Sequence, residues 1–166
     1  MIAALILLPG AVVGAVSAPL IGSALKAHFP PKFISCGFVG VAVMDVAMML
    51  GGAHEWAVAI AYALFMAASG FVLVPDQTHA LNQLPASMNA DGSAVMNTVQ
   101  QLAGAIGTAV ASTLIAECAG ANAASGMSQS ASYVAGFSTS MWVFLGMAVV
   151  GEILALLMFR FSKRVG

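Results

Sequence analysis

The chain has 166 residues, of which 61% are hydrophobic and only 7% are charged. Soluble domains carry roughly 25% charged residues, because a surface in contact with water needs polar cover. The composition therefore excludes a soluble domain and indicates an integral membrane protein. The net charge of −1, without any basic patch interleaved with aromatic residues, excludes a nucleic-acid partner.

Five stretches are long and apolar enough to cross a bilayer, which takes roughly 20 predominantly apolar residues per helix. They cover approximately residues 1–26, 33–51, 56–81, 93–117 and 139–161. We therefore expect an all-α fold, a polytopic transmembrane bundle of five helices that forms a single domain over residues 1–166. Its first partner is the lipid bilayer itself.

The intervals between these stretches carry residues that end helices. Pro30 and Pro31 should end the first helix, and Gly51 with Gly52 the second. Residues 85–92 predict a polar loop. Residues 119–136 are rich in Gly, Ser, Ala and Asn, and predict a flexible exposed loop between the last two helices.

All five basic residues follow the first or the fifth helix: Lys26, Lys32, Arg160, Lys163 and Arg164. Cytoplasmic loops are enriched in Lys and Arg, and successive helices alternate sides of the membrane. We therefore expect a multi-pass protein of the cell membrane with its N-terminus outside and its C-terminus in the cytoplasm. An outside N-terminus without a signal sequence suggests that a part upstream is missing.

Polar residues on the fourth helix fall on one face, because they are spaced three or four positions apart: Asn97, Gln101, Gly104, Thr108 and Ser112. An unsatisfied amide is costly in hydrocarbon, so this face should meet protein or water and not lipid. It is either the wall of a polar cavity or a surface that forms hydrogen bonds to another helix.

Small residues mark two further faces. Gly10 and Gly14 form a GxxxG pattern in the first helix, while Ala148, Gly151 and Ala155 share a face of the fifth. Small residues let the backbones of membrane helices approach closely. These faces indicate either contact between parts that move or ordinary packing of the bundle.

The third helix places Tyr62, Met66 and Ser69 on one face, and Pro75 should bend it near its cytoplasmic end because proline lacks a backbone donor. Two acids also lie inside apolar stretches, Asp45 in the second helix and Glu152 in the fifth. Intramembrane acids are candidates for function, and the alternative is a neutral acid with a structural role. For Glu152 we expect the neutral form, hydrogen-bonded to a neighbouring helix.

Catalytic and metal-binding patterns are not found. The three histidines are scattered, and no hydrolase, zinc-protease or nucleotide-binding motif occurs, so we expect no enzyme, no catalytic residue, no metal and no cofactor. The two cysteines, Cys36 and Cys118, lie near opposite membrane surfaces in the expected topology. We therefore expect no disulfide bond between them.

Two segments carry a family resemblance: LPGA at positions 8–11 followed by APLIG at positions 18–22, and AVMNTVQQLAGAIGTA at positions 94–109. They resemble the C-terminal part of the fourteen-helix drug:proton antiporters of the major facilitator superfamily. The resemblance implies that the chain is an incomplete C-terminal half, containing the last five helices of such a transporter.

In this superfamily two six-helix halves rock around a cavity at the middle of the membrane. The resemblance implies that the first, third and fourth helices face this cavity. The candidate substrate-cavity residues are then Asn97, Gln101 and Thr108 on the fourth helix, with Tyr62 and Met66 on the third. Asp45 and Glu152, on the peripheral second and fifth helices, become weaker candidates for substrate contact.

The resemblance implies a part of a proton-coupled transporter for multidrug or small-molecule efflux. Such a fragment would not be competent alone, and its partner would be the missing N-terminal half or a second copy. Two alternatives remain. One is a membrane protein with a structural or assembly role and no transport activity, and the other is a small homo-oligomeric transporter that uses an intramembrane acid.

Overall fold

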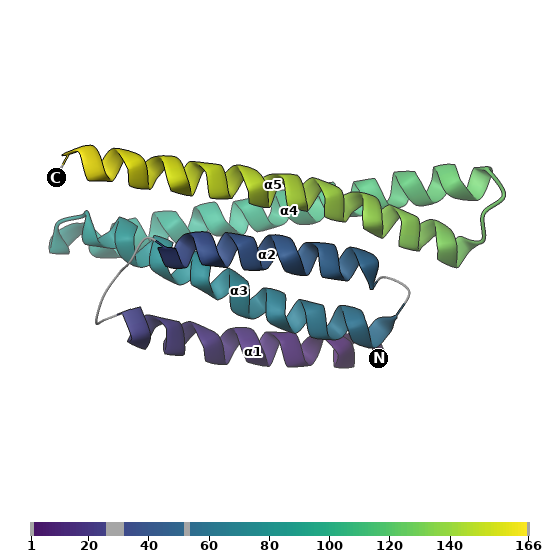
Figure 1. The fold of residues 1–166 in the computed structure, drawn as a ribbon, viewed down its shortest axis with the longest axis horizontal. Coiled ribbons are helices and arrows are strands. Elements are labelled where there is room, and N and C mark those ends of the chain that lie inside the picture. Colours follow the sequence, from purple (N-terminus) through teal and green to yellow (C-terminus); the bar gives the residue numbers. More distant parts are fainter. Residues whose placement is uncertain (1, 26–31, 52–53, 166) are drawn as a thin grey trace. The chain divides into compact units, whose positions relative to one another are not determined.

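The computed structural model describes residues 2–25, 32–51 and 54–165. Within them lie the helices α1 (Ile2–Leu25), α2 (Lys32–Leu50), α3 (Glu55–Asn82), α4 (Asn89–Ala124) and α5 (Gln129–Val165), with a short 3-10 helix η1 (Ala86–Met88) before α4 (Figure 1). All five α-helices are long and apolar enough to cross a membrane. The expected all-α transmembrane fold is therefore confirmed.

The first three helices begin and end within two residues of their predicted limits, because long apolar runs have no other way to satisfy their backbone in hydrocarbon. Pro75 does not end α3, which continues through it to Asn82. The expected helix-ending residues Pro30, Pro31 and Gly52 lie outside the described residues, as does Lys26.

The prediction of a flexible loop over residues 119–136 is wrong. Helix α4 continues to Ala124 and α5 begins at Gln129, so most of the interval is helical. Its composition misled the prediction, because serine and glycine are typical of loops while the alanines that accompany them are strong helix formers. The polar loop expected at residues 85–92 is also shorter, since η1 and then α4 begin inside it.

The chain divides into two compact units. The first consists of Met1–Asp76 with Met141–Gly166, and the second is Gln77–Ser140. The first unit thus holds α1, α2, most of α3 and the C-terminal part of α5, and the second holds α4 with the beginning of α5.

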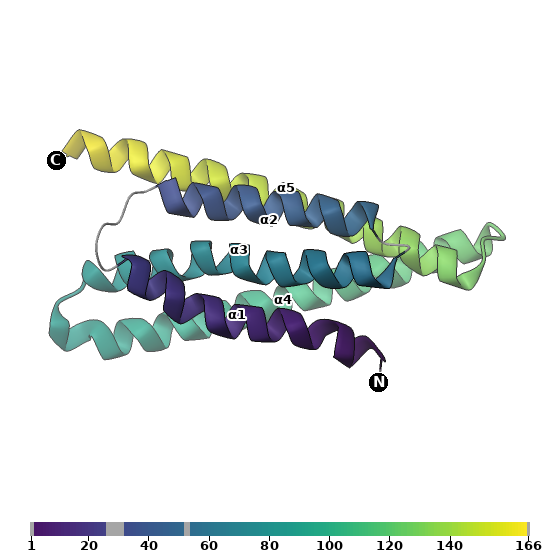
Figure 2. The same ribbon diagram turned by 60° about the horizontal axis from the view of Figure 1, so that its bottom comes forward.

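In the first unit α3 lies between α1 and α2 (Figure 1 and Figure 2). The GxxxG of α1 faces α3: a Cβ atom at Gly10 would lie 2.5 Å from Cε1 of Tyr62, and one at Gly14 would lie 3.6 Å from Cβ of Met66. The contact is reciprocal, because a Cβ atom at Gly70 would lie 2.9 Å from Cδ1 of Ile21. The close contact that the GxxxG pattern predicts is therefore present.

Helix α2 approaches the other side of α3 in the same way. A Cβ atom at Gly37 would lie 3.0 Å from the carbonyl carbon of Phe71, and one at Gly40 would lie 3.0 Å from Cβ of Ala68. The rings of Phe33 and Phe71 stack with their centroids 6.2 Å apart. Glycine thus allows both neighbours of α3 to pack against its backbone.

The C-terminal part of α5 packs against α2 through the small-residue face predicted from the sequence. Ala148 and Ala155 are buried, and a Cβ atom at Gly151 would lie 2.8 Å from Cζ of Phe38. Helices α5 and α2 lie side by side in both views (Figure 1 and Figure 2). Close approach at small residues therefore recurs in all three helix pairs of the first unit.

The second unit is a helical hairpin of α4 and the start of α5. The turn between them is closed by Gly126, whose φ of 90° is a left-handed conformation that favours glycine. Beyond the turn the two backbones nearly touch, since a Cβ atom at Gly136 would lie 2.8 Å from the carbonyl oxygen of Ile115. Ser132 and Ser140, four residues to either side of Gly136, are fully buried in the same stripe.

Gly136→Ala should lower the free energy of unfolding, by about 1–3 kcal/mol, because the added methyl group meets a carbonyl oxygen that cannot move without shifting α4. Gly146→Ala is the matched control on the same helix, where a Cβ atom has nothing within 4 Å. That control should be neutral or stabilising, since alanine is the better helix former. Unfolding in mixed detergent micelles measures both, and a Gly136→Ala variant as stable as the control would contradict the close approach.

Candidate functional site

The polar stripe of α4 comprises Asn97, Gln101, Gly104, Thr108 and Ser112, and all five residues are exposed. The helix itself satisfies one of the hydroxyl groups: Thr108 Oγ1 donates a hydrogen bond of 2.8 Å to the carbonyl oxygen of Gly104. This back-bonding leaves the oxygen of Thr108 able to accept a further hydrogen bond. The stripe therefore presents polar groups with hydrogen-bonding capacity that the described residues leave unfilled.

The two amides of the stripe have no hydrogen-bond partner in the described part of the chain. Among the residues that the structure describes, the side chains of Asn97 and Gln101 form no hydrogen bond. A Cβ atom at Gly104 would have nothing within 4 Å. Of the two interpretations of this face, the described residues offer no support for hydrogen bonding to another helix, and the cavity wall stays a prediction.

Tyr62 and Met66 lie on the face of α3 that contacts α1. Both are half-buried, and they meet the positions of Gly10 and Gly14. Their neighbour Ser69 donates a hydrogen bond of 2.9 Å to the carbonyl oxygen of Met66. The structure thus brings Tyr62 and Met66 together in the first unit, while the α4 stripe belongs to the second. A shared role in one substrate cavity stays a prediction.

Both intramembrane acids have carboxyl groups that are wholly or partly buried. Asp45 in α2 is only 3% exposed. The Oε2 atom of Glu152 is buried and has no hydrogen-bond partner among the described residues. The expected hydrogen bond from Glu152 to a neighbouring helix is therefore not found, because the small residues that surround it on α5 bring no donor and the adjacent Gly151 faces the apolar ring of Phe38.

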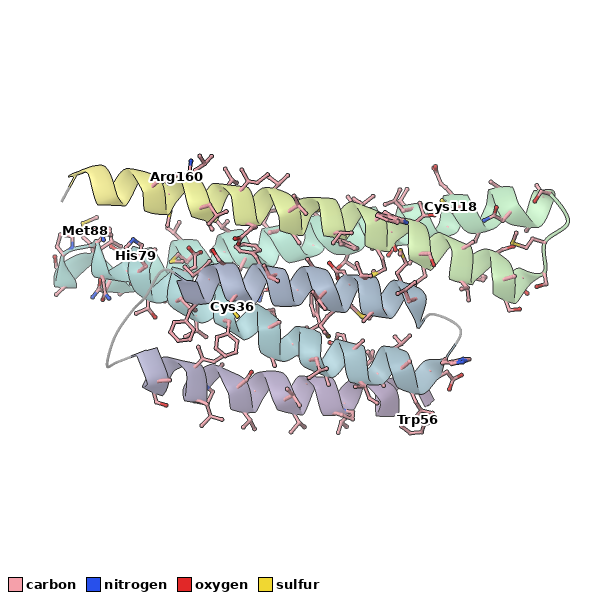
Figure 3. The ribbon with its side chains drawn as sticks, in the orientation of Figure 1. Cys36, Trp56, His79, Met88, Cys118 and Arg160 are labelled. Atoms are coloured by element: carbon pink, nitrogen blue, oxygen red, sulfur yellow. The ribbon has the colours of Figure 1, made fainter. Side chains whose placement is uncertain are left out.

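The remaining candidates are the two cysteines and the side chains that could bind a metal ion. Both Cys36 and Cys118 are free thiols, and they come from different units (Figure 3). Within residues 2–25, 32–51 and 54–165, no three His, Cys, Asp or Glu side chains lie together in a way that could hold a metal ion.

Sequence reasoning missed two features. The stripe of Ser132, Gly136 and Ser140 has a four-residue spacing that would have identified it, had the segment been taken as helical. The second is a groove of about 270 Å³ along α5, lined by Ile153, Leu156, Leu157 and Arg160. Nothing in the periodicity distinguishes these apolar residues from others on the helix.

Comparison with known proteins places the chain in a family. It is 37% identical over 115 residues to the lincomycin resistance protein LmrB of Listeria monocytogenes, and 36% identical over 114 residues to LmrB of Bacillus subtilis. It is 30% identical over 109 residues to the uncharacterized MFS-type transporter YcnB of Bacillus subtilis. The chain belongs to the major facilitator superfamily.

The match to LmrB covers 68% of this chain and 24% of LmrB in both organisms, so the matched stretch spans about a quarter of these curated relatives. The match to YcnB covers 64% of the chain and 23% of YcnB. No protein-family model matches this member of the superfamily, and no solved structure matches it significantly.

Glu152→Met should raise the free energy of unfolding by about 1–3 kcal/mol, because it removes a buried oxygen that no donor compensates and keeps the volume of the side chain. Glu152→Gln, which retains an unpartnered polar group of the same shape, should change it little. Unfolding of the purified chain in mixed micelles tests both variants. A clear loss of stability in Glu152→Met would mean that the carboxyl group does form a structural interaction.

Proposed function

We propose that this chain is part of a proton-coupled exporter of drugs or other small molecules. Two of the relatives are named for resistance to lincomycin, and resistance of that kind is the result expected of an exporter. The chain matches only about a quarter of their length. The remaining helices of the transporter would come from a part outside this sequence or from a second copy.

The observation that carries this proposal is the exposed polar stripe of α4. An amide without a partner is costly in hydrocarbon, so Asn97 and Gln101 need water, a ligand or a polar group of another helix opposite them, and we propose water and ligand. A cavity that alternately opens to the two sides of the membrane supplies both. We infer that Asn97 and Gln101 donate and accept hydrogen bonds to substrate, with Thr108 deeper along the same face.

Tyr62 and Met66 would add an apolar wall. Their half-buried side chains leave part of the ring and of the thioether open, and flexible thioethers suit surfaces that bind varied apolar ligands. A site that combines a few amides with aromatic and thioether groups fits ligands that are largely apolar with a few polar groups. Transport of this kind requires no cofactor, and we propose no enzymatic activity.

Glu152 favours a second candidate, a small homo-oligomeric transporter. Its buried Oε2 atom has no partner among the described residues, and an intramembrane carboxyl group of this kind can carry protons in pumps and transporters. A purely structural membrane protein, the third possibility, has no observation of its own in its favour beyond close packing.

We also propose an orientation, with the N-terminus of the chain outside and its C-terminus in the cytoplasm. Reporter proteins fused after Gly52 and after Gly166 should then report opposite sides, because the second and fifth helices end on opposite sides of the membrane. An alkaline phosphatase and a fluorescent protein reporter, each fused at both positions, provide the measurement. Equal activity of one reporter at both positions would refute the topology.

The stripe can be tested in a chimera in which this chain replaces the matched stretch of LmrB, with Cys36 and Cys118 changed to serine. Cysteine introduced by Asn97→Cys, Gln101→Cys or Thr108→Cys should react with a membrane-impermeant maleimide, because these positions face water. Val110→Cys, on the opposite face of α4, is the matched control and should resist. Equal protection of the stripe and the control would mean that the stripe packs against a helix.

Transport itself gives the decisive experiment. In liposomes the chimera should show proton flux that depends on lincomycin, whereas this chain alone should show none, because alternating access needs two opposed bundles. A chimera that is expressed and folded but carries no flux would contradict the exporter proposal. Robust flux from the chain alone would instead support the homo-oligomeric transporter.

A further inference from the structure

The groove on α5 lies on one face of that helix. Its lining residues, Ile153, Leu156, Leu157 and Arg160, are spaced as i, i+3, i+4 and i+7, which places them along a single stripe. Ala148 and Ala155 on another face of the same helix are buried. The groove therefore opens away from the packed face, and its three apolar residues are each close to half exposed.

The groove is apolar along its length and cationic at one end. Three aliphatic side chains are followed by the Arg160 guanidinium, about 10 Å further along the helix axis than Ile153. Arg160 lies near the C-terminal end of α5, which the structure describes to Val165, and an arginine near the end of a membrane helix extends toward the head groups, because its charge is costly in hydrocarbon. The aliphatic residues thus lie at the depth of the acyl chains, and Arg160 follows at the depth of the lipid head groups.

Arg160 is free to take a ligand. Its side chain points away from α2 (Figure 3), and no carboxylate pairs with it among the described residues. A guanidinium group presents several donors in a planar fork that matches the oxygens of a phosphate group. Two further basic residues, Lys163 and Arg164, follow in the sequence and increase the local positive charge.

We propose that this groove binds an anionic phospholipid. One acyl chain lies along Ile153, Leu156 and Leu157, while the phosphate oxygens accept hydrogen bonds from the Arg160 guanidinium. At about 270 Å³ the groove holds a part of one chain and not a whole lipid. The proposal requires only that α5 spans a membrane, so it does not depend on the transport activity proposed above.

The chemistry of the groove selects an anionic lipid over the other candidates. A free phosphate ion would use the guanidinium and leave the aliphatic part of the groove empty. A zwitterionic lipid would bring a positively charged group of its own close to the Arg160 guanidinium. An anionic lipid places a negative charge beside Arg160 and an acyl chain on the aliphatic residues, so it alone uses both ends.

Native mass spectrometry of the full chain in detergent, with equal amounts of phosphatidylglycerol and phosphatidylcholine added, tests this directly. We expect phosphatidylglycerol to be retained about fivefold over phosphatidylcholine, the ratio that corresponds to one well-placed basic residue at an anionic surface. Arg160→Gln should remove the preference.

The aliphatic part is tested separately by Leu156→Gln, which should reduce retention, against Leu154→Gln, an equally polar change at an exposed residue of α5 outside the groove. Competition by glycerol phosphate is measured on the unmodified chain, so this experiment does not depend on the folding of a variant. Glycerol phosphate should not displace phosphatidylglycerol. Equal retention of both lipids by the unmodified chain, an unchanged preference in Arg160→Gln, or displacement of phosphatidylglycerol by glycerol phosphate would each overturn the proposal.

Discussion

The membrane interior offers no water to a polypeptide, and this constraint shapes the first unit. Each helix must satisfy its own backbone, so close packing is a main source of attraction between the apolar helices of this unit. Helix α3 receives that packing on both sides, from Gly10 and Gly14 of α1 and from Gly37 and Gly40 of α2. At these glycines α1 and α2 come close to side chains or backbone atoms of α3, where a larger residue would not fit without a shift.

Polar groups within the apolar helices depart from this arrangement, and the amides of α4 and the carboxyl group of Glu152 are the examples that matter for function. Helix α4 keeps Asn97 and Gln101 exposed and without partners among the described residues, and Glu152 keeps a buried oxygen atom without a donor. A protein selected for stability alone would replace such groups with leucine. The presence of such groups in hydrophobic helices is the physical basis of the transport function proposed above.

The sequence predicts the five spans and the α1–α3 contact well, because both depend on local features: the length of an apolar run, and a GxxxG that has few uses other than close packing. It fails over residues 119–136, where alanine, serine and glycine suit either a loop or a tightly packed hairpin. Only the position of Ile115 opposite Gly136 decides between them. The missing partner of Glu152 was equally unpredictable, since it depends on which side chain of α2 stands opposite Gly151.

The packing of α1 on α3 is the contact on which the first unit depends, and an engineered disulfide measures it. A Cβ atom at Gly14 would lie 3.6 Å from Cβ of Met66, within the range of about 3.5–4.5 Å found in disulfide bonds. In a chain with Cys36 and Cys118 changed to serine, Gly14→Cys with Met66→Cys should cross-link on mild oxidation in membranes. Gly14→Cys with Leu64→Cys, an exposed position of α3, should not. A failure of the first pair, or equal cross-linking of both, would contradict the account.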